Sequence, residues 1–257
     1  MLKFAANIST MFNELPLLDR FPAAREAGFE AVEILFPYDE PAPKVAAAAT
    51  SAGLEVVLIN APISAGKGSP GIACRPELED EFYDSIKQAR DYALAMGVGQ
   101  MNVLAGSCEL RERDTCLATL QERLASAADE LSADGISILI EPINPKDRSD
   151  YAVPSFEAAM QILKKAGRPN IGLQFDVYHA AMMGLDPIEA FKTYLRRIWH
   201  VQFSDMPGRH EPGSGTIDYA AVFKAIDESG YDGWLSAEYH PSAKTTDSLA
   251  WLKAYAA

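Results

Sequence analysis

ISILIE at residues 136–141 begins a series of four segments that decides the fold of this chain. The other three are IGLQFD (171–176), IWHVQF (198–203) and WLSAE (234–238). Each is a short apolar run with an oxygen-bearing side chain at or near its end, namely Glu141, Asp176, Gln202 and Glu238. Such a pattern places a polar group where a buried strand leaves the core. Four groups of this kind can converge on one hard cation, and ligation by oxygen alone favours Mg²⁺ or Mn²⁺ over zinc.

Similar strand-like runs occur along the whole chain. There are eight in all, at residues 2–8, 31–36, 54–60, 100–106, 136–143, 171–176, 198–205 and 234–239. The runs are apolar on both alternating faces, which is typical of parallel strands covered by helices. Helix-length stretches separate them, around residues 16–27, 41–52, 76–96, 114–133, 155–166, 187–196, 218–229 and 246–255.

Local signals mark the ends of several predicted helices. Gly53 and Gly97 directly follow helical patterns, where a residue in the left-handed conformation commonly ends a helix. Ser155, Asp186 and Asp218 lie at predicted helix starts, where an oxygen-bearing side chain caps the first turn. Eight alternating strands and helices within 257 residues predict an α/β fold, a (β/α)₈ TIM barrel that forms a single domain over residues 1–257.

An open doubly wound sheet would use the same alternation of elements. That fold usually carries a glycine-rich phosphate loop after an early strand, and no such motif follows the first three strand-like runs. We therefore favour the barrel. The glycine-rich segment ISAGKGSPGI at residues 63–72 follows the third run, and we expect it to extend over the barrel mouth.

The composition argues against several classes of protein. A net charge of −13 argues against a nucleic-acid partner, because such proteins carry a clustered basic surface. The cysteines Cys74, Cys108 and Cys116 contain no C-x-x-C pair, so neither a disulfide framework nor a thiolate metal site is expected. The sequence shows no signal-peptide core and no apolar run of about 18 residues that could span a membrane. We expect a soluble cytoplasmic protein with no membrane partner.

The four strand ends would meet in a TIM barrel, because catalytic groups in this fold come from the C-terminal ends of several strands. Glu141, Asp176, Gln202 and Glu238 would come from the last four strands and form a metal site there. The alternative for each residue alone is a solvated polar side chain that opens a loop, but four consecutive cases favour a site. Glu33, in the second run, could line the same pocket or lie at the barrel rim.

Two histidines lie close to these strand ends in the sequence. His179 follows Asp176 by three residues and could reach a ligand of the same metal or a substrate oxygen, or else cap the following helix. His200 precedes Gln202 by two residues and therefore lies on the same face of its strand, but deeper. We expect His200 to be a core histidine whose hydrogen bonds are satisfied.

Arg209 lies in a loop rich in glycine and proline at residues 205–215. Its guanidinium could form a bidentate pair with a substrate carboxylate, a geometry that lysine cannot copy. The alternative is a salt bridge with Glu211 or Asp205 that stiffens the loop. Composition alone favours neither.

In these residues and the segments around them, the chain resembles the hydroxypyruvate isomerase family, part of the larger xylose isomerase-like group of TIM barrels. The resemblance covers nearly the whole chain. It is carried by FAANIS (4–9), FNELP (12–16), AGFEAVEILFPYD (27–39), GIAC (71–74), IEPIN (140–144), QFDVYH (174–179), HVQFSDMPGRHEPGSGTIDY (200–219) and GYDGWLSAEYHP (230–241). The most specific of these is GRHEPGSGTIDY at residues 208–219.

The resemblance implies both an activity and roles for individual residues. Members of the family interconvert hydroxypyruvate and tartronate semialdehyde, and close relatives isomerise 2-oxo-tetronates or epimerise ketoses at C3. By this resemblance Glu141 and Glu238 are the acid/base pair beside the metal, with Asp176 and Gln202 completing a site for Mg²⁺ or Mn²⁺. The residues expected to contact the substrate, a small hydroxy-oxo acid or sugar acid, are His179, Arg209, Asp147 and Glu211.

Other functions stay open from sequence alone. A dehydratase acting on an inositol-like substrate would use the same acid/base pair, and a sugar-acid binding protein would keep the pocket without turnover. The DNA-repair endonucleases of the same group use a histidine-rich trinuclear zinc site and a basic groove. Four histidines and a net charge of −13 argue against that activity. The sequence leaves the preferred substrate, the metal and the number of subunits open.

Overall fold

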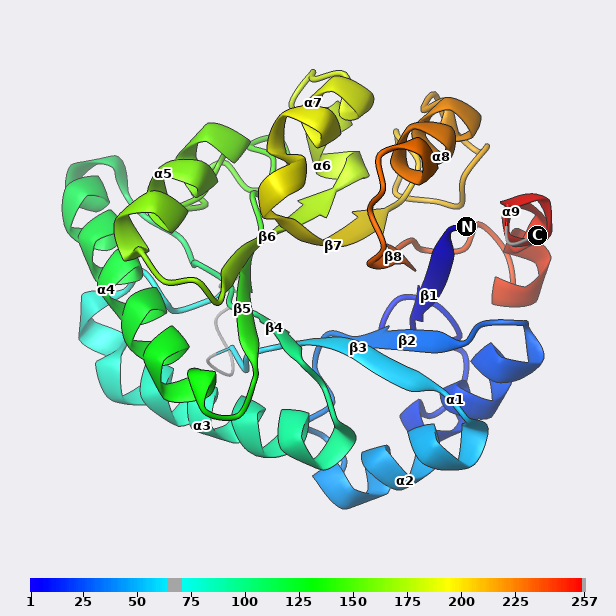
Figure 1. Ribbon diagram of the computed structural model, residues 1–257, viewed down its shortest axis with the longest axis horizontal. Helices are drawn as coiled ribbons and strands as arrows, with labels where there is room; N and C mark the ends of the chain where they lie inside the picture. Colours follow the sequence, from blue (N-terminus) through cyan, green and yellow to red (C-terminus); the bar gives the residue numbers. More distant parts are fainter. Residues whose placement is uncertain (64–70, 256–257) are drawn as a thin grey trace.

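Eight parallel strands close into a barrel in the computed structural model, which describes residues 1–63 and 71–255 (Figure 1). The strands follow one another around the barrel in chain order, and β8 pairs with β1. They are β1 (Lys3–Asn7), β2 (Ala31–Ile34), β3 (Glu55–Asn60), β4 (Gln100–Asn102), β5 (Ser137–Ile140), β6 (Ile171–Asp176), β7 (Ile198–Phe203) and β8 (Trp234–Ala237). The predicted (β/α)₈ TIM barrel is confirmed.

Helices cover the outside of the barrel (Figure 1). They are α1 (Leu17–Glu26), α2 (Ala42–Ala52), α3 (Glu79–Met96), α4 (Arg113–Ser132), α5 (Phe156–Ala166), α6 (Val177–Met182), α7 (Pro187–Tyr194), α8 (Tyr219–Glu228) and α9 (Ala250–Tyr255). Short 3₁₀ turns occupy Pro76–Leu78, Leu110–Glu112, Leu195–Arg197 and Thr245–Ser248. The sequence did not predict α6, which begins directly after β6 with no intervening loop because Asp176 Oδ1 accepts the backbone N–H of Tyr178 at 2.8 Å.

The predicted helix ends are confirmed in their local geometry. Gly53 and Gly97 take the left-handed conformation, with φ of 66° and 71°, and each ends its helix. The side-chain oxygens of Ser155, Asp186 and Asp218 accept backbone N–H groups in the first turns of α5, α7 and α8. Local sequence therefore fixes these helix boundaries.

Apolar side chains fill the layer between the barrel and its helices. Phe203 of β7 illustrates the packing, because its ring contacts Phe4 of β1, Phe223 of α8 and Trp251 of α9 in edge-to-face geometry. Their centroid separations of 5.1 to 6.0 Å are favourable for aromatic pairs. This cluster ties the C-terminal helix to the seam where the barrel closes.

The interior of the barrel is polar near the C-terminal strand ends, unlike the aliphatic layers usual in this fold, whereas apolar residues such as Ala5, Ala31 and Leu139 fill its other end. The fully buried polar side chains include Asn7, Glu33, Gln174, His200 and Gln202. Each lies on a strand, so its neighbours are fixed by the register of the sheet; Asp176 of β6, for example, pairs with Gln202 of β7. The polar interior forms the floor beneath the mouth formed by the C-terminal strand ends.

The predicted extension of residues 63–72 over the mouth falls largely on residues 64–70, which lie outside the described residues. Of the flanking residues, Gly71 forms an isolated bridge with Ala105 after β4. A side chain at Gly71 would collide with the Leu104 carbonyl oxygen, which a Cβ would approach to 2.2 Å. The end of this segment is thus anchored against the β4 loop.

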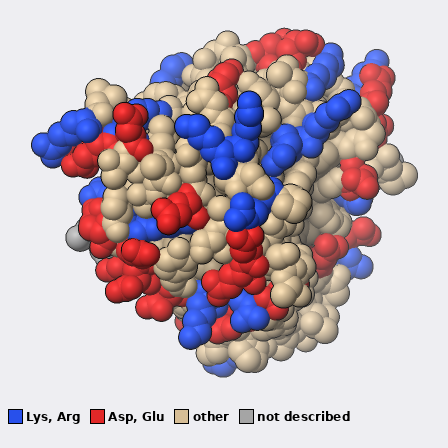
Figure 2. Space-filling model, turned by 60° about the vertical axis from the view of Figure 1, so that its left-hand side comes forward, with Lys and Arg blue, Asp and Glu red and all other residues tan. Residues whose placement is uncertain are grey.

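Acidic and basic side chains lie next to one another on the surface shown in Figure 2. On that face the acidic excess of the chain, a net charge of −13, is not gathered into one patch. Among the helices of the described residues, none combines the length and the apolar character needed to cross a membrane.

Close packing of β6 against β7 generates a test of the fold. A Cβ at Gly172 would lie 2.3 Å from the indole ring of Trp199, whereas a Cβ at Gly99 would meet no atom within 4 Å. We expect Gly172→Ala to lower the free energy of unfolding by about 1–3 kcal/mol through overpacking, and Gly99→Ala to change it by about 0.5 kcal/mol or less. Urea unfolding of both variants measures the difference, and equal effects would contradict this packing.

Candidate active site

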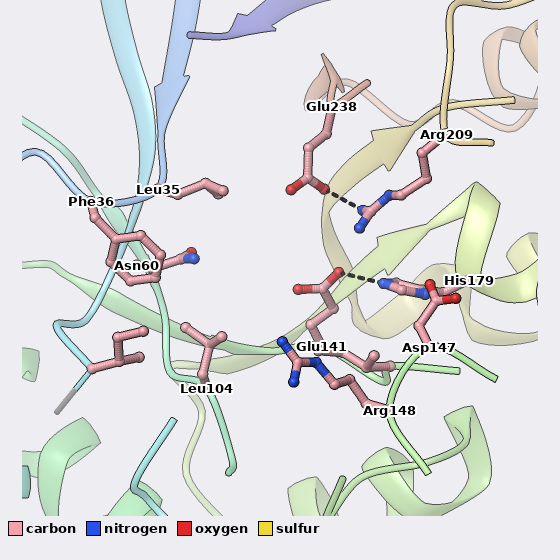
Figure 3. A pocket seen from close by; sticks show the side chains of 12 residues that line it. Leu35, Phe36, Asn60, Leu104, Glu141, Asp147, Arg148, His179, Arg209 and Glu238 are labelled. Atoms are coloured by element: carbon pink, nitrogen blue, oxygen red, sulfur yellow. Dashed lines mark hydrogen bonds and ion pairs between the residues drawn. The ribbon is translucent and has the colours of Figure 1, made fainter. Parts of the chain in front are cut away.

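A cavity of about 370 Å³ opens at the C-terminal mouth of the barrel. Figure 3 shows two unlike walls. One carries Leu35, Phe36, Asn60 and Leu104, which come from the ends of β2, β3 and β4. The other carries Glu238, Arg209, His179 and Asp147, with Glu141 beside His179 and Arg148 below them in this view. The pocket is therefore largely apolar on one side and densely charged on the other.

Three carboxylates lie at the charged side of the mouth. Glu141 directly follows β5, Asp176 is the last residue of β6, and Glu238 directly follows β8. All three are buried. The expected convergence of strand-end carboxylates therefore occurs for these residues.

Arg209 joins two of these carboxylates. Its Nη2 donates to Asp176 Oδ2 and to Glu238 Oε2, both at 3.0 Å, and its guanidinium lies 4.9 Å from the ring centroid of Tyr178. Backbone hydrogen bonds hold the residue on both sides, from Arg209 N to the Asp205 oxygen and from His240 N to the Arg209 oxygen. The guanidinium pairs with these two carboxylates rather than with Glu211 or Asp205 in its own loop.

Negative charge exceeds positive charge at this site, and the pKa values reflect it. Burial, reinforced by the charges of Glu238 and Asp176, raises the pKa of Glu141 well above its usual value. Burial also raises the pKa of Glu238 to about 8, although the charge of Arg209 opposes the shift. For Arg209 burial acts to lower the pKa, but the three surrounding carboxylates raise it above its usual value. A second cation or a shared proton would relieve the imbalance.

His179 lies on α6 and is held in one orientation by Asn144. The Asn144 side-chain oxygen accepts the backbone N–H groups of Lys146 and Asp147, so its amide NH₂ faces His179 Nδ1 at 2.7 Å. Nδ1 is then the acceptor, which leaves the proton of the neutral ring on Nε2. Burial lowers the pKa of His179 to about 4, which keeps the ring neutral near pH 7.

His179 Nε2 lies 3.7 Å from both Glu141 Oε1 and Asp176 Oδ2. A neutral ring with a proton on Nε2 is a hydrogen-bond donor at this point, and it is not a metal ligand in that tautomer. The geometry therefore favours a contact with a substrate oxygen over coordination of an ion.

A chain of buried hydrogen bonds lies beneath the carboxylates. Gln174 Nε2 donates to Glu141 Oε2 at 2.9 Å and to Gln202 Oε1 at 2.6 Å. Gln202 Nε2 donates to Glu33 Oε1 at 2.5 Å, and His200 Nε2 lies 2.6 Å from Glu33 Oε2. The prediction of a satisfied core histidine at His200 is confirmed, while Glu33 neither lines the described pocket nor lies at the rim.

Asp147 and Glu211, the two remaining residues predicted to contact the substrate, lie in different places. Asp147 lines the pocket, and its Oδ2 accepts from Asn144 Nδ2 at 2.9 Å. Glu211 does not line the described pocket, because its carboxylate turns outward and accepts both the backbone N–H and the hydroxyl of Ser242. Asp147 and Glu211 are therefore not brought together, and contact of either with a substrate stays a prediction.

The residues present fit a divalent ion. A carboxylate oxygen of Glu141 and one of Asp176 lie within 4.8 Å of each other, and Arg209 already places a cationic group against Asp176 and Glu238. Carboxylate oxygens in excess of the available positive charge suit Mg²⁺ or Mn²⁺. The fourth predicted ligand, Gln202, directs its oxygen to Gln174, so it could join the ligands only after its carboxamide turns.

Sequence reasoning missed several polar groups of the site. Asn60 and Asn102 end β3 and β4 and could have been found by the same strand-end rule that located Glu141. Gln174 lies two residues before Asp176, on the same face of β6, which is also a readable signal. Arg148 lies in a loop with no periodic pattern, so only the structure places it at the pocket.

Comparisons with known proteins agree with this geometry. A family model described as xylose isomerase-like TIM barrel matches residues 21–255. The chain is 40% identical to a 2-oxo-tetronate isomerase of Cupriavidus necator over 257 residues, which cover 99% of each protein. It is also 37% identical to the hydroxypyruvate isomerase of Escherichia coli, over 99% of this chain and 100% of that one. The chain belongs to the xylose isomerase-like TIM barrel family.

A solved structure supports the same conclusion for the architecture. The crystal structure of a Brucella melitensis protein titled AP endonuclease, family 2, matches with a TM-score of 0.96 at 39% identity and covers 99% of each chain. The predicted resemblance to hydroxypyruvate isomerases is confirmed over the full length of the chain.

The raised pKa of Glu238 predicts how the stability of the metal-free protein depends on pH. The folded carboxyl has a pKa of about 8 against an ordinary value of 4.5, so between these values the folded state keeps a proton that the unfolded state releases. The free energy of unfolding should therefore fall, by about 4 kcal/mol, as the pH rises from about 5 to 9. Urea unfolding in the presence of a chelator measures this decline.

Glu238→Gln provides the matched control for this measurement, because it keeps the shape of the side chain and removes the titrating group. The decline with pH should be clearly smaller in this variant than in the original protein. An unchanged decline would mean that Glu238 does not titrate in this range.

Proposed function

We propose that this protein is a metal-assisted isomerase that interconverts hydroxypyruvate and tartronate semialdehyde, with 2-oxo-tetronates as the alternative substrates. Two full-length relatives named for these activities support the proposal. The single observation that carries it is the placement of two buried carboxylates, Glu141 and Glu238, at one small pocket. Both reactions move a carbonyl between neighbouring carbons, and they require a proton to leave one carbon and reach the next.

Glu141 and Glu238 would act as the base and the acid. They reach the pocket from β5 and β8, so they can approach the two reacting carbons from different sides (Figure 3). One must be ionised to remove a proton and the other protonated to return one. Burial raises the pKa of both carboxyls in the metal-free protein, and the positive charge of a bound ion would oppose that rise, so that one group could be ionised while the other keeps a proton.

The divalent ion would be held by Glu141, Asp176 and Glu238, with Gln202 completing the ligand set after reorientation. When bound, Mg²⁺ or Mn²⁺ supplies positive charge beside the oxygens that become negative as the enediolate forms. The hydrogen bonds from Gln174 and Asn102 to Glu141 Oε2, at 2.9 and 3.3 Å, would orient that carboxylate.

His179 and Arg209 would act on the same oxygens. The neutral His179 would donate its Nε2 proton to a substrate oxygen, in an orientation fixed by Asn144. Arg209 lies between Asp176 and Glu238, so its fixed charge would lie beside the reacting carbons and would stabilise the enediolate without reorganisation.

Substituting either glutamate tests the two-carboxylate mechanism. We expect Glu141→Gln and Glu238→Gln each to lower kcat by on the order of 10³-fold, because a carboxamide cannot exchange the proton. The measurement is an NMR time course with hydroxypyruvate and 2-oxo-tetronates in D₂O with added Mg²⁺, which reports both deuterium incorporation and the product formed. Glu130→Gln, on the exposed surface of α4, controls for the loss of a carboxylate elsewhere. Full activity in either pocket variant would end the two-carboxylate proposal.

Removal of the metal tests the ion site independently of the mechanism. A chelator should abolish turnover, and Mg²⁺ or Mn²⁺ should restore it. Calorimetric titration with Mn²⁺ should give one site per chain, and Asp176→Asn should weaken that binding by on the order of 10²-fold through the loss of a charged ligand. Stoichiometric binding of equal strength in this variant would exclude Asp176 as a ligand.

A further inference from the structure

Two cationic side chains line the described part of the pocket, Arg148 and Arg209. The proposed substrates are acids, so their carboxylate requires a cationic or strongly donating partner once it leaves water. One of the two arginines must supply this partner. Its position determines how the substrate lies in the pocket and whether the enzyme selects acids over neutral hydroxy ketones.

Three carboxylates, those of Glu141, Asp176 and Glu238, surround Arg209 at the reacting centre. Arg209 donates to the carboxylates of Asp176 and Glu238 at 3.0 Å and packs over the ring of Tyr178. A substrate carboxylate placed against Arg209 would also lie beside these two acidic groups and Glu141, and the like charges would oppose it. The surroundings of Arg209 therefore suit the oxygens of the reacting carbons rather than the carboxylate.

Asn60 argues against the opposite wall as the carboxylate position. Its Oδ1 is buried, lines the pocket wall with Leu35, Phe36 and Leu104, and has no hydrogen-bond partner among the described residues. A buried acceptor of this kind calls for a donor such as a hydroxyl group, which a carboxylate cannot supply. An apolar wall with one acceptor thus suits the hydroxylated end of a substrate.

Arg148 lies on the charged wall, on the loop between β5 and α5. Arg148 lines the pocket, and Figure 3 shows its guanidinium turned toward the interior. The loop is anchored, because Arg148 N donates to the Asn144 oxygen and Tyr151 N donates to the Arg148 oxygen. An isolated bridge between Ser107 and Tyr151 fixes its far end. The base of the Arg148 side chain is therefore held at the pocket edge.

We propose that Arg148 binds the carboxylate of the substrate and thereby selects hydroxy-oxo acids over neutral hydroxy ketones. The inference rests on the proposed function for the class of substrate. The substrate then lies with its carboxylate at Arg148 and its reacting carbons beside Glu141 and Glu238. In a 2-oxo-tetronate, which has one more carbon than hydroxypyruvate, the C4 hydroxyl lies toward Asn60. Arg209 then contacts the reacting oxygens, whereas Arg148 binds the carboxylate.

The test compares an acid with its neutral counterpart. Dihydroxyacetone carries a hydroxymethyl group in place of the carboxylate of hydroxypyruvate and keeps the reacting carbons. We expect Arg148→Met to lower kcat/KM for hydroxypyruvate by about 100-fold, mainly through KM, since the lost contact is a charge-assisted pair. The ratio of kcat/KM for hydroxypyruvate to that for deuterium exchange into dihydroxyacetone should fall by a similar factor. Arg148→Lys should recover part of the loss, because a point charge replaces the planar fork.

Lys146→Met is the matched control, since it removes the same charge from the same loop at a residue that does not line the described pocket. Its ratio between the two substrates should stay within about twofold of the original, as expected for an exposed surface substitution. A ratio in Arg148→Met that equals that of Lys146→Met would overturn the proposal.

Binding of glycerate separates this inference from the proposed function. Glycerate keeps the carboxylate but has no ketone, so its affinity reports the carboxylate site without turnover. Calorimetry should show affinity about 100-fold weaker in Arg148→Met than in the original protein or in Lys146→Met. Unchanged affinity would refute the role of Arg148. Weakened affinity in a protein that isomerises no hydroxy-oxo acid would refute the proposed function and leave the carboxylate site standing.

Discussion

An excess of buried negative charge at the barrel mouth is the constraint on which the rest of the site depends. Glu141, Asp176 and Glu238 surround the guanidinium of Arg209, and burial deprives the three carboxylates of most of their water. Buried charges of like sign destabilise one another, so the fold must hold a proton or attract a cation there. Those two responses, proton storage and metal binding, are the properties that the proposed mechanism requires.

Polar side chains inside the barrel hold these buried carboxylates in position. Gln174 and Gln202 link Glu141 to Glu33 through a chain of hydrogen bonds. His200 and Asn7 also form hydrogen bonds with Glu33. Aliphatic side chains would fill the same space but could not orient a carboxylate. The buried network spans strands on opposite sides of the barrel, so a change in strand register would leave polar groups unpaired in the core.

The division of the pocket into a charged and a largely apolar wall links the geometry to selectivity. A small hydroxy-oxo acid has both a carboxylate and a hydroxyl end, and the two walls offer Arg148 and Asn60 respectively. Between them lie the paired glutamates. Family membership defines the barrel and the mouth, whereas individual loop residues such as Arg148 determine which molecule fits.

The sequence alone determined the barrel, its order of elements and the carboxylates at three strand ends, because periodicity and helix capping act over a few neighbouring residues. It could not show that α6 follows β6 directly, that Gln202 turns to Gln174, or that Glu211 faces Ser242. Side-chain direction depends on partners distant in the chain, and Arg148 reaches the pocket through a loop without periodicity. Only the closed barrel, which places such residues at one mouth, decided those contacts.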